Sequence, residues 1–139
     1  MSTPLGDVPD LLRSGGAGPF ADFIGIQIAS ASPDEVRAHW TVTDALLQPY
    51  GLLHGGVHCA VVETLASVAA AVWLGPEGRV VGTTNSTDFF RAARLGDRLS
   101  STARPLHRGR SRQVWRVETR DEQDRLVSAG QVALQNLTG

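Results

Sequence analysis

Residues 48–67 read QPYGLLHGGVHCAVVETLAS, a polar loop that runs into an almost wholly apolar segment. Glu63 is the one charged residue of this stretch, and an ionised carboxylate inside an apolar helix costs on the order of several kcal/mol unless it is paired or has a task. Gly55 and Gly56 stand where such a helix would begin, so their N–H groups can point at a ligand oxygen. A donor at a helix start and a carboxylate further along are groups that carbonyl chemistry uses.

The apolar segment, residues 57–74, predicts one long helix that ends at Gly75-Pro76. Alternating or apolar runs on both sides predict strands, two before the helix and four after it, over residues 24–30, 36–42, 79–90, 98–107, 113–121 and 126–137. The short connections between the last four strands favour antiparallel neighbours, so the fold class is α+β. A helix that is apolar nearly all round needs cover on several sides, which a curved sheet of about six strands wrapped around it would supply.

The chain of 139 residues is long enough for one domain, and we expect a flexible arm over residues 1–19 and a single domain over residues 20–139. A net charge of -1 gives no global basic field, so nucleic acid is not an expected partner. Glu63 and Ser67 argue against a membrane span through the apolar segment. The lone Cys59 forms no disulfide within the chain, and no secretory signal is visible, so we expect a cytoplasmic protein with no membrane partner.

The spacing of Gly55 and Glu63 limits how they could work together. Eight residues of helix separate them by about 12 Å along the axis. A substrate carbonyl must lie roughly 3 Å from its N–H donor and similarly close to its nucleophile or base. One chain therefore cannot easily bring both groups to one carbonyl, whereas a second chain packed antiparallel could. The spacing predicts a site shared across a dimer interface.

Residues 46–67 resemble the active-site segment of hotdog-fold acyl-CoA thioesterases, of the phenylacetate-pathway (PaaI-like) and 4-hydroxybenzoyl-CoA thioesterase group. The shared pattern is a loop with Asn or Gln, then His-Gly-Gly, then a helix with Asp or Glu. The strand order and residues 85–96 and 107–111 also resemble the group. The resemblance implies a hotdog fold and hydrolysis of an acyl- or aryl-CoA thioester to free acid and coenzyme A. It implies no cofactor, because coenzyme A is part of the substrate.

The resemblance also implies roles for five residues of the segment. Glu63 matches the carboxylate that acts as nucleophile or general base, and Gly55 matches the glycine whose amide polarises the thioester carbonyl. Gln48 matches a loop residue near the substrate and the attacking water. His54 matches the histidine that holds the loop, and Ser67 matches a Ser or Thr that positions the carboxylate or the water.

Coenzyme A carries a pyrophosphate and a 3′-phosphate, and guanidinium forks suit phosphate oxygens. The residues expected to bind the substrate or its coenzyme A moiety are Gly56, Asn85, Arg91, Arg108, Arg110 and Ser111. The resemblance further implies homodimers with shared active sites, which pair into homotetramers as dimers of dimers.

The same residues admit other interpretations. Glu63 could be a buried carboxylate paired with a neighbouring Arg or with a backbone N–H. His54 and His58 have an i, i+4 spacing usable for zinc, but a Gly follows the first His where a zinc protease has Glu, so no metal is expected. A non-catalytic acyl-CoA binding module would not need Glu63, and sub-stoichiometric thiol release would favour it. A hydratase on the same fold would need a His/Asp arrangement that we do not find.

Overall fold

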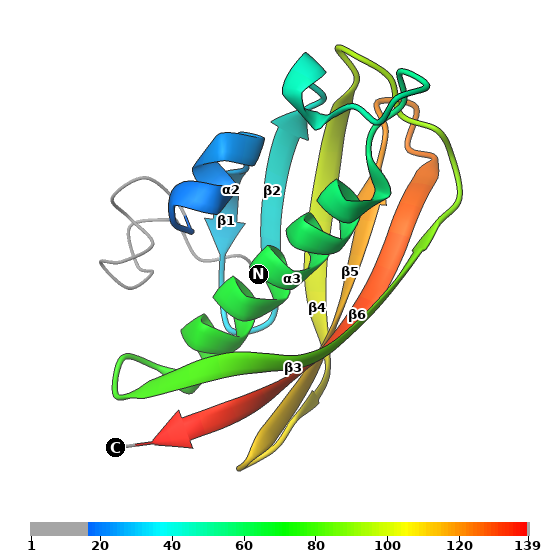
Figure 1. Ribbon diagram of the computed structural model, residues 1–139. Coiled ribbons are helices and arrows are strands. Elements are labelled where there is room, and N and C mark those ends of the chain that lie inside the picture. Colours follow the sequence, from blue (N-terminus) through cyan, green and yellow to red (C-terminus); the bar gives the residue numbers. More distant parts are fainter. Residues whose placement is uncertain (1–16, 139) are drawn as a thin grey trace.

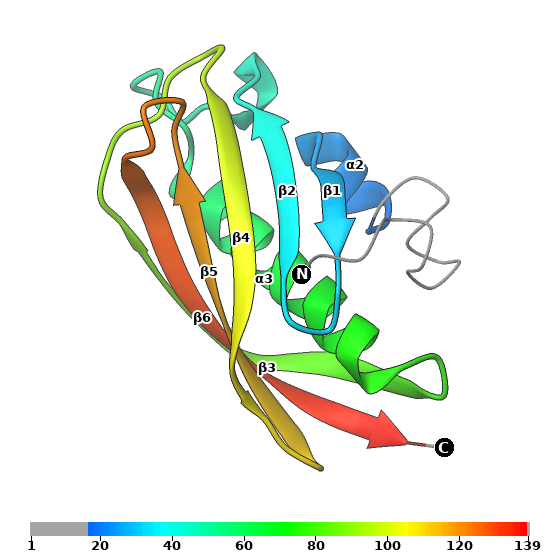
Figure 2. The same ribbon diagram turned by 180° about the vertical axis from the view of Figure 1, so that it is seen from behind.

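The computed structural model describes residues 17–138, so residues 1–16 of the expected arm lie outside the described residues. The elements in chain order are α2 (Pro19–Ile24), β1 (Gln27–Ala31), β2 (Val36–Thr41), the 3-10 helix η2 (Asp44–Leu46), α3 (Gly55–Leu74), β3 (Gly78–Phe89), β4 (Arg98–Arg108), β5 (Arg112–Arg120) and β6 (Leu126–Thr138). The strands form one antiparallel sheet of six, in the order β1-β2-β4-β5-β6-β3. The sheet curves around α3 (Figure 1), and its convex side faces away from the helix (Figure 2). The predicted α+β hotdog fold is confirmed.

Helix α3 forms because residues 55–74 contain no proline and carry apolar side chains on nearly every side. It ends at Gly75, whose φ of 93° is unfavourable for other residues, and Pro76 follows. Helix α3 is long and apolar enough to span a membrane, but the core helix of a soluble protein can have the same length and composition. In this fold the helix lies across the concave face of the sheet, where Val61, Val62 and Leu65 are fully buried.

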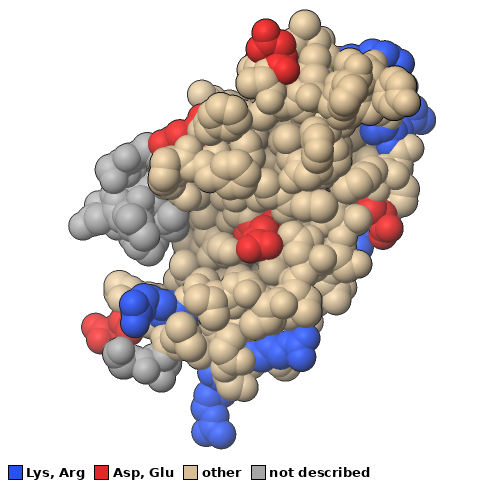
Figure 3. Space-filling model, in the orientation of Figure 1, with Lys and Arg blue, Asp and Glu red and all other residues tan. Residues whose placement is uncertain are grey.

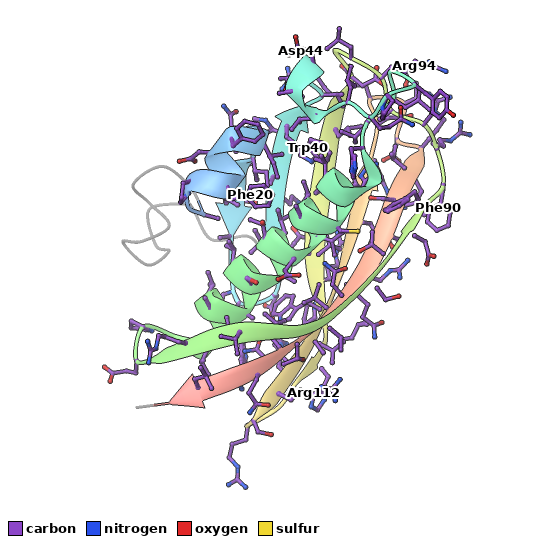
Figure 4. The ribbon with its side chains drawn as sticks, in the orientation of Figure 1. Phe20, Trp40, Asp44, Phe90, Arg94 and Arg112 are labelled. Carbon is purple, nitrogen blue, oxygen red and sulfur yellow. The ribbon has the colours of Figure 1, made fainter. Side chains whose placement is uncertain are left out.

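The inner face of the sheet shows the alternation expected of half-buried strands. Along β2, Val36, Ala38 and Trp40 are buried while the residues between them are more exposed. Trp40 lies between β2 and α3 (Figure 4), and its indole N–H donates to Ser101 Oγ at 3.1 Å. Ser101 in turn shares a 2.7 Å hydrogen bond with Thr119. The core therefore satisfies its buried polar groups across β2, β4 and β5.

The N-terminal strand begins later than its pattern predicts. Ile24 is the last residue of α2 rather than the first of a strand, and β1 starts at Gln27. Pro19 at the first helical turn and Gly25 with φ 88° bracket a short helix. Its period places Ala21 and Ile24 on one buried face. The prediction of a strand from residue 24 was wrong, because Pro19 and Gly25 favour a short helix more strongly than the apolar alternation favours a strand.

Strand β3 is at one edge of the sheet. It pairs with β6 from Gly78↔Thr138 to Phe89↔Ser128, and within the described residues its other edge has no partner strand. Most of its side chains are exposed, although the strand runs beside α3. A long unpaired edge that crosses the helix is a surface on which a second chain can add.

Candidate active site

The start of α3 offers one free backbone donor. His54 is the N-cap residue, and its Nδ1 accepts a hydrogen bond from the Gly56 N–H at 2.8 Å. The His54 N–H donates to the Leu46 carbonyl at 2.9 Å, which ties the loop to the helix. In residues 17–138 the Gly55 N–H has no acceptor. Gly55 therefore presents an unused donor at the positive end of the helix dipole, whereas the Gly56 N–H is already used by the cap.

A side chain at position 55 would require the ring of Phe89 to move. A Cβ there would lie 2.5 Å from Cε2 of Phe89, because the ring of this β3 residue covers the first turn of the helix. The same ring stacks on His58, with 5.6 Å between centroids. The aromatic ring of Phe89 therefore lies against both Gly55 and His58.

Gln48 opens into the same cavity as Gly55. Its Oε1 accepts from the backbone N–H groups of Tyr50 and Leu52, so the loop uses the carbonyl oxygen, and among residues 17–138 the side-chain NH₂ has no acceptor. The cavity has a volume of about 380 Å³ and is lined by Gln48, Leu52, Leu53, Gly55, His58, Phe89, Phe90, Arg91, Ala92 and Ala93. Figure 4 shows Phe90 just past β3, on the side where α3 begins. The loop and the start of α3 thus place their free donors in a cavity whose other walls are mostly apolar and aromatic.

Glu63 lies in the middle of α3 and is exposed, so a single chain does not bury its carboxylate. Figure 3 shows an isolated acidic patch on a face that is otherwise largely uncharged. The Asn85 side-chain N–H donates to Glu63 Oε1 at 3.3 Å and to the Cys59 carbonyl at 2.9 Å. Thr87 Oγ1 donates to Asn85 Oδ1 at 2.7 Å, which orients the amide. Within residues 17–138 no Arg pairs with Glu63, so a single chain gives its carboxylate no ion-pair partner among the described residues.

The carboxylate opens into a second cavity, not into the one that Gly55 lines. This cavity has a volume of about 320 Å³ and is lined by Phe20, Gly56, Cys59, Ala60, Glu63, Thr64 and Asn85. Ser67, one turn after Glu63, is half-buried, lines neither cavity and makes no hydrogen bond to Glu63 in the described structure. In one chain, therefore, Gln48 and Gly55 line one cavity, and Glu63 and Asn85 line another.

The arginines expected to bind coenzyme A are divided between the two ends of the fold. Arg91 lines the cavity of Gln48 and Gly55. Arg108 is engaged within the chain, 2.8 Å from Asp34 and 5.9 Å from the ring of Trp73. Arg110 and Ser111 lie in the β4–β5 turn, at the opposite end of the sheet from the start of α3 (Figure 1).

A buried polar network fixes the turn that carries Arg110. The Asn136 side-chain NH₂ donates to the carbonyls of Gly109 and Arg110, at 3.0 and 3.1 Å. Gln113, which is fully buried, donates to Asn136 Oδ1 at 2.8 Å and to the α3 carbonyl of Ala70 at 3.3 Å. The turn is thus held against the C-terminal part of α3.

His58 is a site residue that the sequence analysis considered only as a metal ligand. It is 3% exposed, packs edge-on to Trp40 at 6.0 Å, and lines the cavity of Gln48 and Gly55. Burial lowers the pKa of His58 to about 4, so its imidazole is neutral at pH 7. Residues 17–138 contain no group of three His, Cys, Asp or Glu side chains placed to hold a metal ion. The only signal in the sequence was a histidine on the apolar helix, one turn after His54.

A family profile and a number of known proteins are similar to this chain. Residues 50–128 match the profile of the Thioesterase superfamily. A Mycobacterium tuberculosis (strain H37Rv) protein, provisionally named an esterase, is 48% identical over 122 residues, 86% of each chain. The 1,4-dihydroxy-2-naphthoyl-CoA hydrolase of Escherichia coli K12 is 33% identical over 123 residues, 88% of this chain and 90% of that one. The crystal structure of AziG from S. sahachiroi superposes with a TM-score of 0.86 and 56% identity, covering 88% of this chain and 99% of the other.

Proposed function

This chain belongs to the Thioesterase superfamily and is a thioester hydrolase, and on that premise we propose that it hydrolyses an acyl- or aryl-CoA thioester at a site that two copies of the chain build together. The observation that carries the proposal is the division of the donors and the carboxylate between two cavities of one chain. Gln48 and Gly55 supply the donor half, and Glu63 with Asn85 supplies the carboxylate half. The Escherichia coli relative, named for hydrolysis of a naphthoyl-CoA, supports a coenzyme A thioester as the substrate.

The second copy is proposed to pack antiparallel along the edge formed by β3 and α3. The free edge of β3 supports this arrangement, since its backbone groups can pair with a second β3. A two-fold interface uses the same patch on both chains, so each half-site would meet the complementary half of the other chain, which gives two complete sites per dimer. Desolvation at the interface would then surround Glu63 with protein, where the Asn85 amide offsets part of the burial of its charge. We further propose that such dimers pair into tetramers.

Catalysis is proposed to begin with polarisation of the thioester carbonyl. The Gly55 N–H donates to the carbonyl oxygen, and the dipole of α3 stabilises the negative charge that develops there. Glu63 of the second copy either attacks the carbonyl carbon through a carboxylate oxygen or takes a proton from a water that attacks. In both routes the carbon–sulfur bond breaks and coenzyme A leaves as a thiolate that takes up a proton. In the first route water then cleaves the mixed anhydride and releases the acid and free Glu63.

The coenzyme A phosphates are proposed to bind Arg91 of one copy and the β4–β5 turn, with Arg110 and Ser111, of the second copy, because these groups lie at opposite ends of a single chain. Arg108 is a poorer candidate, because its guanidinium already bonds Asp34 and the Pro33 carbonyl. No cofactor is needed beyond the coenzyme A of the substrate.

Thiol release from a panel of acyl- and aryl-CoA thioesters tests the proposed function. Wild-type protein should release many equivalents of thiol per chain, and Glu63→Gln should lose at least about a hundredfold in kcat, the scale of one general acid-base group. Glu63 is exposed in a single chain, so the variant should keep its circular dichroism spectrum and its oligomeric mass. Undiminished turnover by Glu63→Gln would sink the proposal.

A further inference from the structure

The cavity of Gln48 and Gly55 contains one polar side chain that the proposed reaction leaves idle, His58. Its ring lies between Trp40 and Phe89, with centroids 6.0 and 5.6 Å away. Polar groups buried in apolar surroundings are nearly always hydrogen-bonded in native proteins. His58 has no hydrogen-bond partner within the described residues, so its imidazole is available to a ligand.

The two ring nitrogens of His58 are not equivalent. Nδ1 is shielded from solvent and has no hydrogen-bond partner within the described residues, whereas Nε2 is not shielded in this way. A proton on Nδ1 would be a buried donor without an acceptor, which is more costly than a bare lone pair. The neutral tautomer that fits this packing therefore carries its proton on Nε2. His58 presents a hydrogen-bond donor to the cavity, not a charge and not an acceptor.

The other polar groups of this cavity are also donors. The Gly55 N–H is free, and the Gln48 side chain has its NH₂ left over. A thioester carbonyl can use these two, so the Nε2–H of His58 needs a second acceptor on the same substrate. His58 follows Gly55 by three residues, about 4.5 Å along the helix axis. The second acceptor thus belongs to the acyl group, a few bonds from the thioester carbonyl.

The remaining walls favour a flat acyl group. Phe89 and Phe90 line the cavity with Leu52 and Leu53, and the Phe89 ring is already stacked on His58. Aromatic rings prefer offset-stacked or edge-on neighbours, which such a cavity provides. A volume of about 380 Å³ has room for an aryl group of one or two rings.

We propose that His58 is a specificity-determining residue, whose Nε2–H donates to an oxygen substituent on an aromatic acyl group. The site thereby selects oxygen-substituted aryl thioesters over the unsubstituted ones. The inference rests on the proposed function, since it takes the cavity of Gln48 and Gly55 as the acyl site. His58 touches the acyl group and takes no part in breaking the thioester bond.

The variants His58→Met and His58→Gln test this role as a matched pair. The two side chains have nearly the same length, but only Gln ends in an N–H donor. The substrates are benzoyl-CoA and its 2-, 3- and 4-hydroxy derivatives. Wild type should hydrolyse at least one hydroxybenzoyl-CoA with a kcat/KM about tenfold above that of benzoyl-CoA, the effect of one hydrogen bond. His58→Met should reduce this ratio to about one, and His58→Gln should keep part of the preference.

Binding measured without turnover separates this inference from the proposed function. In a Glu63→Gln background, calorimetry should give the same preference as a ratio of the dissociation constants of benzoyl-CoA and the preferred hydroxybenzoyl-CoA. Addition of His58→Met should reduce that ratio to about one. Absence of hydrolysis by wild type together with a His58-dependent binding ratio would overturn the proposed function and support the role of His58. A wild type that does not discriminate between the substrates, or a His58→Met variant that loses both equally, would overturn the role of His58.

Discussion

The side-chain amide of Asn85 on β3 lies 3.3 Å from the carboxylate of Glu63 on α3, and it also donates to the carbonyl of Cys59 at 2.9 Å. One amide thus bridges the edge strand and the central helix beside the only charged residue of α3, a helix that the structure describes in full. Thr87 holds the other end of that amide. The relationship gives Glu63 a fixed orientation before any second chain arrives.

Removal of this amide should slow the reaction without loss of the fold. We expect Asn85→Ala to lower kcat by roughly ten- to a hundredfold with little change in KM, because the carboxylate loses the contact that orients it. Both residues are exposed in a single chain, so the melting temperature should change little. Steady-state kinetics and thermal denaturation check this. The control is Thr87→Val, which keeps the bond from Asn85 to Glu63 and should lose less activity; equal losses in both variants would contradict a direct role of Asn85.

Mixed dimers should regain activity that neither parent variant has. If Gln48 of one chain and Glu63 of the other serve one site, a dimer of Glu63→Gln with Gln48→Ala has one intact site and one doubly defective site. Random exchange of subunits should therefore restore about a quarter of wild-type activity, since half of the dimers are mixed and half of their sites are intact. The measurement is thiol release after co-refolding of the two inactive variants. Activity no higher than the average of the parents would show that each site lies within one chain.

The β4–β5 turn should contribute to coenzyme A affinity and not to chemistry. We expect Arg110→Ala to raise KM for an acyl-CoA several-fold and to leave kcat nearly unchanged, because a phosphate contact binds ground state and transition state alike. The same acyl group on N-acetylcysteamine, which lacks the phosphates, should show no such change. Arg116→Ala is the matched control, since Arg116 is an exposed arginine paired with Glu118 on β5. Equal effects of Arg110→Ala on both substrates would contradict a phosphate contact.

Stability should fall in mild acid through His58. Burial lowers its pKa in the folded protein to about 4, below the ordinary value of 6.5 that the unfolded chain retains. Between these values the unfolded state binds a proton that the folded state does not, so the unfolding free energy decreases as pH falls from about 6.5 to 4. The loss reaches about 3 kcal/mol at the low end, and none of it is present above pH 6.5.

The pH dependence is measured against a variant that cannot titrate at this position. His58→Gln should lack this part of the loss, so the difference in unfolding free energy between the two proteins should shift in favour of the variant as the pH decreases. Urea denaturation at pH 7.5, 6.0 and 4.5 gives the values. Parallel stability curves for the two proteins would show that His58 takes up a proton as readily in the folded state as in the unfolded one.

Local patterns were enough to predict most of the fold. The continuous apolar segment over residues 57–74 and the glycine after Leu74 predicted α3. The alternation along residues 36–42 predicted β2. The first strand was misplaced because Pro19 and Gly25 bracket a short helix that apolar alternation does not reveal. The expected roles of Gln48, Gly55 and Glu63 stay predictions, as do those of the other site residues, until turnover is measured.

The chain's order of residues by itself predicted a helix over residues 57–74, with Gly55 near its first turn and Glu63 eight residues further on, too far along the axis to serve the same carbonyl. Helix geometry is local, so the sequence suffices for such a distance. Only the tertiary structure decided that Asn85 reaches Glu63, that Phe89 covers Gly55, and that His58 faces the donor cavity rather than a metal. These contacts join α3 to β3, which curves past the helix along the sheet edge, and the curvature depends on the packing of all six strands.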